Sequence, residues 1–226
     1  MSLPTTIGGV ALAFAGYPVA RRLGGRFGVP AVLPDDETVR EDLLKWLVTG
    51  ALLAYVLVVE TEPLGSLGAT LPPPILPGSG VGGLLALLGW WAGGVVGTVV
   101  LSTVAYNLFR HVDWDTSEEF TDEQADRPTA LFLFTGITAG ITESVLYQAY
   151  PIERLAALSG SVALAGVASW LAFTAVHYAT DRFSLQATVF TSVPALAVTA
   201  LYVLSGSVYV VVLVHATVNA LSFLSQ

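Results

Sequence analysis

The chain contains no cysteine, and only 12% of its 226 residues are charged. The absence of cysteine excludes disulfides, iron–sulfur clusters, thiolate zinc sites and a cysteine nucleophile. The charged fraction is about half that of a soluble domain, whereas 54% of the residues are hydrophobic. Because apolar runs also recur along the whole length, this composition is typical of a polytopic membrane protein.

Basic residues are scarce as well. Lys45 is the only lysine, and the formal net charge is −8. This acid-rich composition argues against nucleic acid as a partner, and it suits soluble surfaces that face high salt, as in halophilic proteins. We therefore expect membrane lipid, and no nucleic acid, among the partners.

Seven apolar runs together predict an all-α fold, a polytopic transmembrane helical bundle of about seven spans. They cover residues 3–20, 43–59, 81–109, 129–150, 160–179, 186–204 and 208–225. The first run is short for a span, and we expect it to be retained rather than cleaved as a signal peptide because no basic side chain precedes it. We divide this single membrane unit into N-terminal membrane helices with an acidic loop, residues 1–128, and a four-helix core, residues 129–226.

The distribution of basic residues predicts the orientation of the bundle. Residues 21–45 are expected to form a polar loop, with a helix start at Pro34-Asp-Asp-Glu37. If this loop, residues 109–127 and residues 180–185 face the cytoplasm, eight of the nine Lys and Arg residues lie inside, and only Arg154 lies outside. The positive-inside rule then predicts a multi-pass protein of the cell membrane with its N-terminus outside and its C-terminus in the cytoplasm.

Three of the apolar runs carry ionisable groups. These are Glu143, His177 and His215, and Asn219 follows His215 by one helical turn. A charged group at mid-membrane costs roughly 2.5–3.5 kcal/mol even on the lenient insertion scale. If the helix of Glu143 continues to Leu158, Glu143 and His177 lie at nearly the same depth on antiparallel neighbours. We expect these groups to converge on one polar cavity, the alternative being a separate structural hydrogen bond for each.

The segments that carry these groups resemble a known family. Glu143-Ser-Val-Leu-Tyr-Gln148, Phe173-Thr-Ala-Val-His177 and His215-Ala-Thr-Val-Asn219 are similar to the motifs of the CPBP intramembrane endopeptidases, also called the Abi or type II CAAX prenyl protease family. The family motifs are Glu-Glu-x-x-x-Arg, Phe-x-x-x-His and His-x-x-x-Asn/Asp, and the last two are intact within residues 136–222. In the first motif, Ser144 and Gln148 replace Glu and Arg. Losing both members of an ion pair is milder than losing one, and Ser144 and Gln148 are predicted to share a neutral hydrogen bond.

The resemblance implies hydrolysis of a peptide bond in a membrane-anchored or lipidated peptide or protein, with residues 129–226 as the catalytic core. By carry-over, Glu143 activates a water as general base and His177 positions that water. His215 and Asn219 would stabilise the oxyanion. The supporting side chains would be Ser144, Tyr147, Gln148 and Phe173. The resemblance implies no cofactor, and the alternative is a zinc ion held by Glu143, His177 and His215 with an open water position.

Two other functions fit the same residues. Because Ser144 and Gln148 replace the ion pair of the first motif, the chain is alternatively a family member without protease activity that serves as a scaffold or immunity-type partner. A third possibility is an ion-coupled transporter that uses the intramembrane acid and histidines as a proton relay. The sequence has no pair of matching interrupted segments, which disfavours the transporter. We rank the protease first, the inactive relative second and the transporter third.

Overall fold

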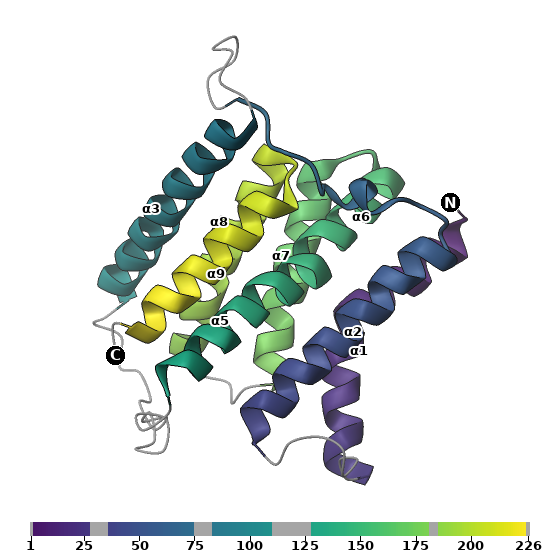
Figure 1. Ribbon diagram of the computed structural model, residues 1–226, viewed down its shortest axis with the longest axis horizontal. Helices are drawn as coiled ribbons and strands as arrows, with labels where there is room; N and C mark the ends of the chain where they lie inside the picture. Colours follow the sequence, from purple (N-terminus) through teal and green to yellow (C-terminus); the bar gives the residue numbers. More distant parts are fainter. Residues whose placement is uncertain (1, 28–35, 75–82, 110–127, 181–184, 225–226) are drawn as a thin grey trace.

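A computed structural model describes residues 2–27, 36–74, 83–109, 128–180 and 185–224. In this part of the chain all regular elements are helical, which confirms the predicted all-α fold. The helices lie alongside one another in one bundle, and the start of α1 and the end of α9 lie at opposite ends of it (Figure 1). The elements are α1 (Leu3–Phe27), α2 (Glu37–Val58), η1 (Leu64–Leu67), α3 (Gly83–Phe109), α5 (Thr129–Glu143), η2 (Ser144–Ala149), α6 (Tyr150–Ser159), α7 (Val162–Thr180), α8 (Leu185–Ser205) and α9 (Val208–Leu224).

The start of α2 follows the predicted signal. Asp36 precedes the first turn, and its side chain accepts a hydrogen bond from the backbone N–H of Val39. An aspartate at this position satisfies one of the free N–H groups of the first helical turn. The helix start predicted at residues 34–37 is therefore confirmed.

The predicted polar loop over residues 21–45 is wrong at both ends, because α1 continues to Phe27 and α2 begins at Glu37. The charged residues in this range lie on helices and pair between them. Arg21 of α1 donates to Glu41 of α2, with 2.7 Å between Nε and Oε1. Polar side chains at the ends of two adjacent helices thus resemble a loop in composition, although the backbone is helical.

Several helices are long and apolar enough to cross a membrane. Within the described residues these stretches are Leu3–Gly24, Gly83–Phe109 and Thr129–Ser159, and shorter apolar helices cover Val162–His177, Thr191–Ser205 and Val208–Ser222. The first apolar run, residues 3–20, therefore belongs to a helix that is long enough to span. These helices define a membrane protein.

Residues Thr129–Ser159 form one continuous helix with a wide turn in its middle. The wide turn is η2, a π-helix that begins directly after Glu143. Pro151 follows it at the start of α6, where its missing N–H is tolerated. The helix ends at Gly160, whose φ of 70° favours glycine. The predicted continuation of this helix past Pro151 to the region of Leu158 is confirmed.

The backbones of α5 and α9 approach closely at Gly140. A Cβ atom at this position would lie 2.7 Å from both the backbone nitrogen and the Cα atom of Ala216. Contacts that short do not occur, so the crossing requires a glycine. The crossing lies one turn before Glu143 and next to His215, and it therefore brings these two side chains together.

A buried ion pair lies near the other end of the long helix. Nε and Nη2 of Arg154 donate to Oε2 of Glu60 at 2.9 and 2.8 Å. The hydroxyl of Tyr150 donates to Oε1 of the same carboxylate at 2.6 Å, and Nη2 of Arg154 also donates to the hydroxyl of Ser66 at 3.1 Å. We call these four residues the Glu60 cluster. It fastens α6 to the segment that follows α2.

Candidate active site

Glu143 and His215 lie side by side in the interior of the bundle. Oε2 of Glu143 is 3.8 Å from Nε2 of His215. Both residues are buried, the first at the end of α5 and the second on α9. Their proximity follows from the glycine at residue 140, which allows the two helix backbones to approach.

The four residues predicted to act in catalysis line one cavity of about 330 Å³. They are Glu143, His177, His215 and Asn219. Phe173 lies between the two histidines, with ring centroids 4.7 Å from His177 and 6.2 Å from His215, edge-on in both cases. Tyr147 stacks on the same phenylalanine at 4.9 Å. The structure thus brings the predicted residues together, and the aromatic side chains of the first two motifs pack between their helices.

One residue of this site was not selected from the sequence. Nζ of Lys45 donates a hydrogen bond to Oε1 of Glu143 at 2.8 Å. Lys45 falls in the predicted polar loop over residues 21–45, but it lies on α2 about two turns beyond the Asp36 cap. The available signal was a single lysine inside a helix whose start the sequence already indicated.

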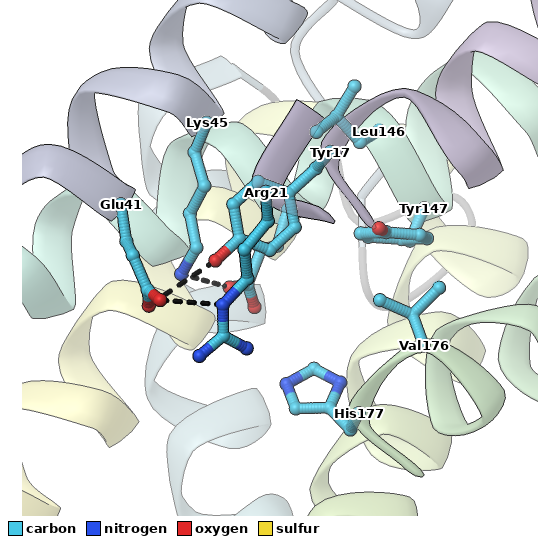
Figure 2. Close-up of a pocket in the computed structure, with 9 residues that line it drawn as sticks. Tyr17, Arg21, Glu41, Lys45, Leu146, Tyr147, Val176 and His177 are labelled. Carbon is cyan, nitrogen blue, oxygen red and sulfur yellow. Dashed lines mark hydrogen bonds and ion pairs between the residues drawn. The ribbon is translucent and has the colours of Figure 1, made fainter. Parts of the chain in front are cut away.

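A second, smaller cavity of about 120 Å³ lies against the same ion pair. Lys45, Glu143 and His177 line it, and they also line the larger cavity. Figure 2 shows Lys45 and His177 entering the smaller cavity from different helices, with Tyr17 and Arg21 of α1 beside them. The ion pair therefore lies between a small polar cavity and the larger one.

Ser144 and Gln148, both of which the structure describes, do not form the predicted hydrogen bond with each other. The hydroxyl of Ser144 instead lies 3.5 Å from Nδ1 of His215. Gln148 is fully buried, and neither polar atom of its amide has a partner among the described residues. The prediction assumed a regular α-helix, whereas η2 has the i→i+5 spacing of a π-helix.

The contacts of Glu143, His177 and His215 test whether these residues can hold a zinc ion, which is the alternative to a site without metal. Among the described residues, no three His, Asp or Glu side chains are arranged to hold one metal ion. One oxygen of Glu143 accepts from the ammonium group of Lys45, whose positive charge would repel a zinc ion bound to the same carboxylate. This arrangement does not fit a zinc site, and we derive no step through a metal.

A comparison with protein families finds a similarity over the part of the chain that carries the predicted site residues. The model described as type II CAAX prenyl endopeptidase Rce1-like matches residues 125–221. The match contains all three motifs and ends before the last residues of α9, and it confirms the resemblance to the CPBP family over this part of the chain. Lys45 lies outside it. No curated protein and no solved structure matches the chain.

Proposed function

We propose that this chain is an intramembrane endopeptidase that hydrolyses a peptide bond in a membrane-associated or lipidated substrate. The observation that carries the proposal is that Glu143, His177, His215 and Asn219 line one cavity. All four residues lie within the region that matches the Rce1-like model. Most other side chains that line this cavity are apolar or hydroxyl-bearing. A mainly apolar cavity with a few convergent polar groups is typical of a ligand-binding site.

In the proposed reaction Glu143 is the general base. The oxygen of a water molecule positioned by His177 attacks the peptide carbonyl carbon while Glu143 takes one proton from that water. The electron pair of the carbonyl bond moves to the carbonyl oxygen and forms an oxyanion. When the intermediate collapses, the C–N bond breaks and the proton on Glu143 passes to the leaving amine nitrogen. The immediate products are a carboxylic acid and an amine, which then exchange a proton to give a carboxylate and an ammonium group, and no other reactant is needed.

The oxyanion is stabilised by His215 and Asn219, which line the same cavity. Ser144 supports the required tautomer of the imidazole. When its hydroxyl donates to Nδ1 of His215, 3.5 Å away, the other ring nitrogen carries the proton and donates to the oxyanion. In this scheme the serine that replaces the second glutamate of the first motif orients a histidine.

The experiment uses the full chain in liposomes with a panel of membrane-tethered peptides, with and without a lipid group. Cleavage in water enriched in ¹⁸O should place the label in the new carboxylate, which mass spectrometry detects. Glu143→Gln should remove this cleavage, and equal cleavage by that variant would contradict the assignment of the general base.

The second candidate is a family member without protease activity, such as a scaffold or immunity-type partner. It is favoured by the uncharged residues Ser144 and Gln148 in the first motif, and by the amide of Gln148, which has no partner among the described residues. A wild-type chain that cleaves no peptide of the panel would favour this candidate. Glu143→Gln would then leave the cellular phenotype unchanged.

The proposal includes a multi-pass arrangement in the cell membrane with the N-terminus outside and the C-terminus in the cytoplasm. It is supported by Figure 1, in which the start of α1 and the end of α9 lie at opposite ends of the bundle. The acid-rich composition suits soluble surfaces that face high salt. Because the chain has no cysteine, Ser2→Cys and Gln226→Cys each introduce a single thiol. A membrane-impermeant maleimide should label the first in intact cells and the second only after lysis.

A further inference from the structure

We propose that Lys45 is a positioning residue for the hydrolysis, and that it supplies the positive charge which the first motif of this chain lacks. The inference rests on the proposed function. It assigns a role to α2, which lies outside the matched residues 125–221. The N-terminal helices then complete the site.

The two oxygens of Glu143 have different partners. Oε1 accepts from Nζ of Lys45 at 2.8 Å, whereas Oε2 faces Nε2 of His215 at 3.8 Å. The terminal torsion of a glutamate is broad and roughly two-fold, so the backbone alone does not fix the plane of the carboxylate. The ammonium group fixes it by holding one oxygen. The second oxygen is thereby kept on the side of His215 and the larger cavity, where a water must bind.

The charge balance of the site also depends on Lys45. A buried carboxylate without a partner is strongly unfavourable, more so at membrane depth. Gln148 occupies the motif position of the arginine, but it is uncharged and makes no hydrogen bond with another described residue. The cation that contacts Glu143 is instead Lys45 of α2, which lies 98 residues earlier in the chain.

Lys45 is itself held in place. Its ammonium lies 5.7 Å from the ring centroid of Tyr17, within the range of a cation–π contact. Only 16% of its side chain is exposed. The lysine lines both cavities, so it can act on the carboxylate without blocking either one.

The first test compares Lys45→Met with Lys45→Arg in the full chain. Lys45→Met removes the charge but keeps most of the stem, and kcat should fall on the order of 10- to 100-fold with little change in KM, because the base loses its orientation. Lys45→Arg retains a positive charge and should recover most of the loss. Arg22→Met removes a positive charge at an exposed position on α1 and serves as the matched control, with kcat unchanged. If Lys45→Met does not fold, Lys45→Gln takes its place.

The second test does not need activity. The infrared carboxylate band of Glu143 is obtained as the difference between the wild type and Glu143→Gln. It should shift in Lys45→Met and stay near its original position in Lys45→Arg. A band that is unaffected by Lys45→Met would overturn the pairing.

The two tests separate this inference from the proposed function. Wild-type kcat in Lys45→Met, or an Arg variant as impaired as the Met variant, would overturn the role of Lys45 and leave the hydrolase intact. A wild-type chain without any cleavage would overturn the hydrolase and with it the catalytic role of Lys45, even if the infrared band reports the ion pair.

Discussion

Among the residues that the structure describes, two buried glutamates pair with a basic side chain, and their surroundings differ. In the Glu60 cluster, both carboxylate oxygens accept close hydrogen bonds, and the paired side chains are 0% and 4% exposed. In the other pair, Lys45 contacts one oxygen of Glu143, and the second oxygen lies 3.8 Å from Nε2 of His215, beside a cavity. The first carboxylate accepts three close hydrogen bonds, whereas the second accepts one and faces a cavity in which a water can bind.

This difference distinguishes a structural pair from a reactive one. A buried charge in a structural role is stabilised when every acceptor is used. A general base needs the opposite, because a free lone pair must face the position of the water. Charge and burial alone would therefore rank the two glutamates as equals, and only the partners of each oxygen separate them.

The largest expected effect comes from Glu143→Gln. Cleavage should fall by about 10²- to 10⁴-fold, since general base catalysis contributes that range. Glu60→Gln is the matched control. Activity per folded molecule should be retained in that variant, and peptide cleavage measured alongside the folded fraction checks both. Loss of cleavage in both variants would remove the distinction between the two glutamates.

The next largest effect concerns stability at the Glu60 cluster. Arg154→Met should lower the free energy of unfolding by about 3–5 kcal/mol, because it leaves Glu60 buried without a cation. Unfolding in mixed micelles, followed by near-UV circular dichroism, measures the change. The double variant Glu60→Leu/Arg154→Met should be less destabilised than the single variant. An equal or larger loss of stability in the double variant would show that packing, and not charge, stabilises the contact between α6 and the segment that follows α2.

Gly140→Ala should reduce both activity and stability. Its Cβ would meet the backbone of Ala216, so α9 must move away from α5 and separate His215 from Glu143. We expect a stability loss of about 1–3 kcal/mol and a fall in cleavage of up to about 100-fold. Gly93→Ala is the control, since a Cβ there meets no described atom within 4 Å. Similar behaviour of the two variants would contradict the importance of the crossing.

A smaller effect, of opposite sign, is expected at Gln148. Its buried amide has no partner among the described residues, and leaving such a group unsatisfied costs about 1–3 kcal/mol. Gln148→Leu should therefore raise the free energy of unfolding by about 1 kcal/mol with cleavage retained. The same micelle titration measures it, and a clear destabilisation would indicate that the amide has a role in this chain.

Metal removal should have the smallest effect. The donors around Glu143 do not form a three-residue metal site among the described residues, so incubation with a chelator should leave the rate of cleavage unchanged. Elemental analysis of the purified protein provides the control. Loss of activity with the chelator, and recovery with zinc, would favour the alternative ligand set.

The sequence predicted the helices well and their partners less well. Apolar runs and the Asp36 cap located most helices, because burial in a bilayer requires long apolar segments. The three motifs also indicated that Glu143 and the histidines would share a cavity. The cation at Glu143 was missed because hydrophobic patterns report which segments are buried, and they do not report which helices become neighbours.

Two further features, the pairing of Arg154 and the wide turn η2, could not be predicted from the sequence for similar reasons. Arg154 was expected only as a charge on the outer side, although it is buried against Glu60, which directly follows the apolar run over residues 43–59. The wide turn η2 contains neither glycine nor proline, so none of its residues signals a departure from a regular α-helix. The expected Ser144–Gln148 hydrogen bond failed for the same reason, because it presupposed regular helical spacing.

The wide turn has a consequence for how the chain tolerates insertions and deletions. Glu143 and Arg154 lie on the same continuous helix, about 16 Å apart along its axis at 1.5 Å per residue, and η2 lies between them. In a regular helix each added or removed residue turns everything beyond it by about 100°. A change of length within residues 144–149 would therefore rotate Arg154 relative to Glu143. Either Arg154 would lose its contact with Glu60, or Glu143 would turn away from His215 and the cavity.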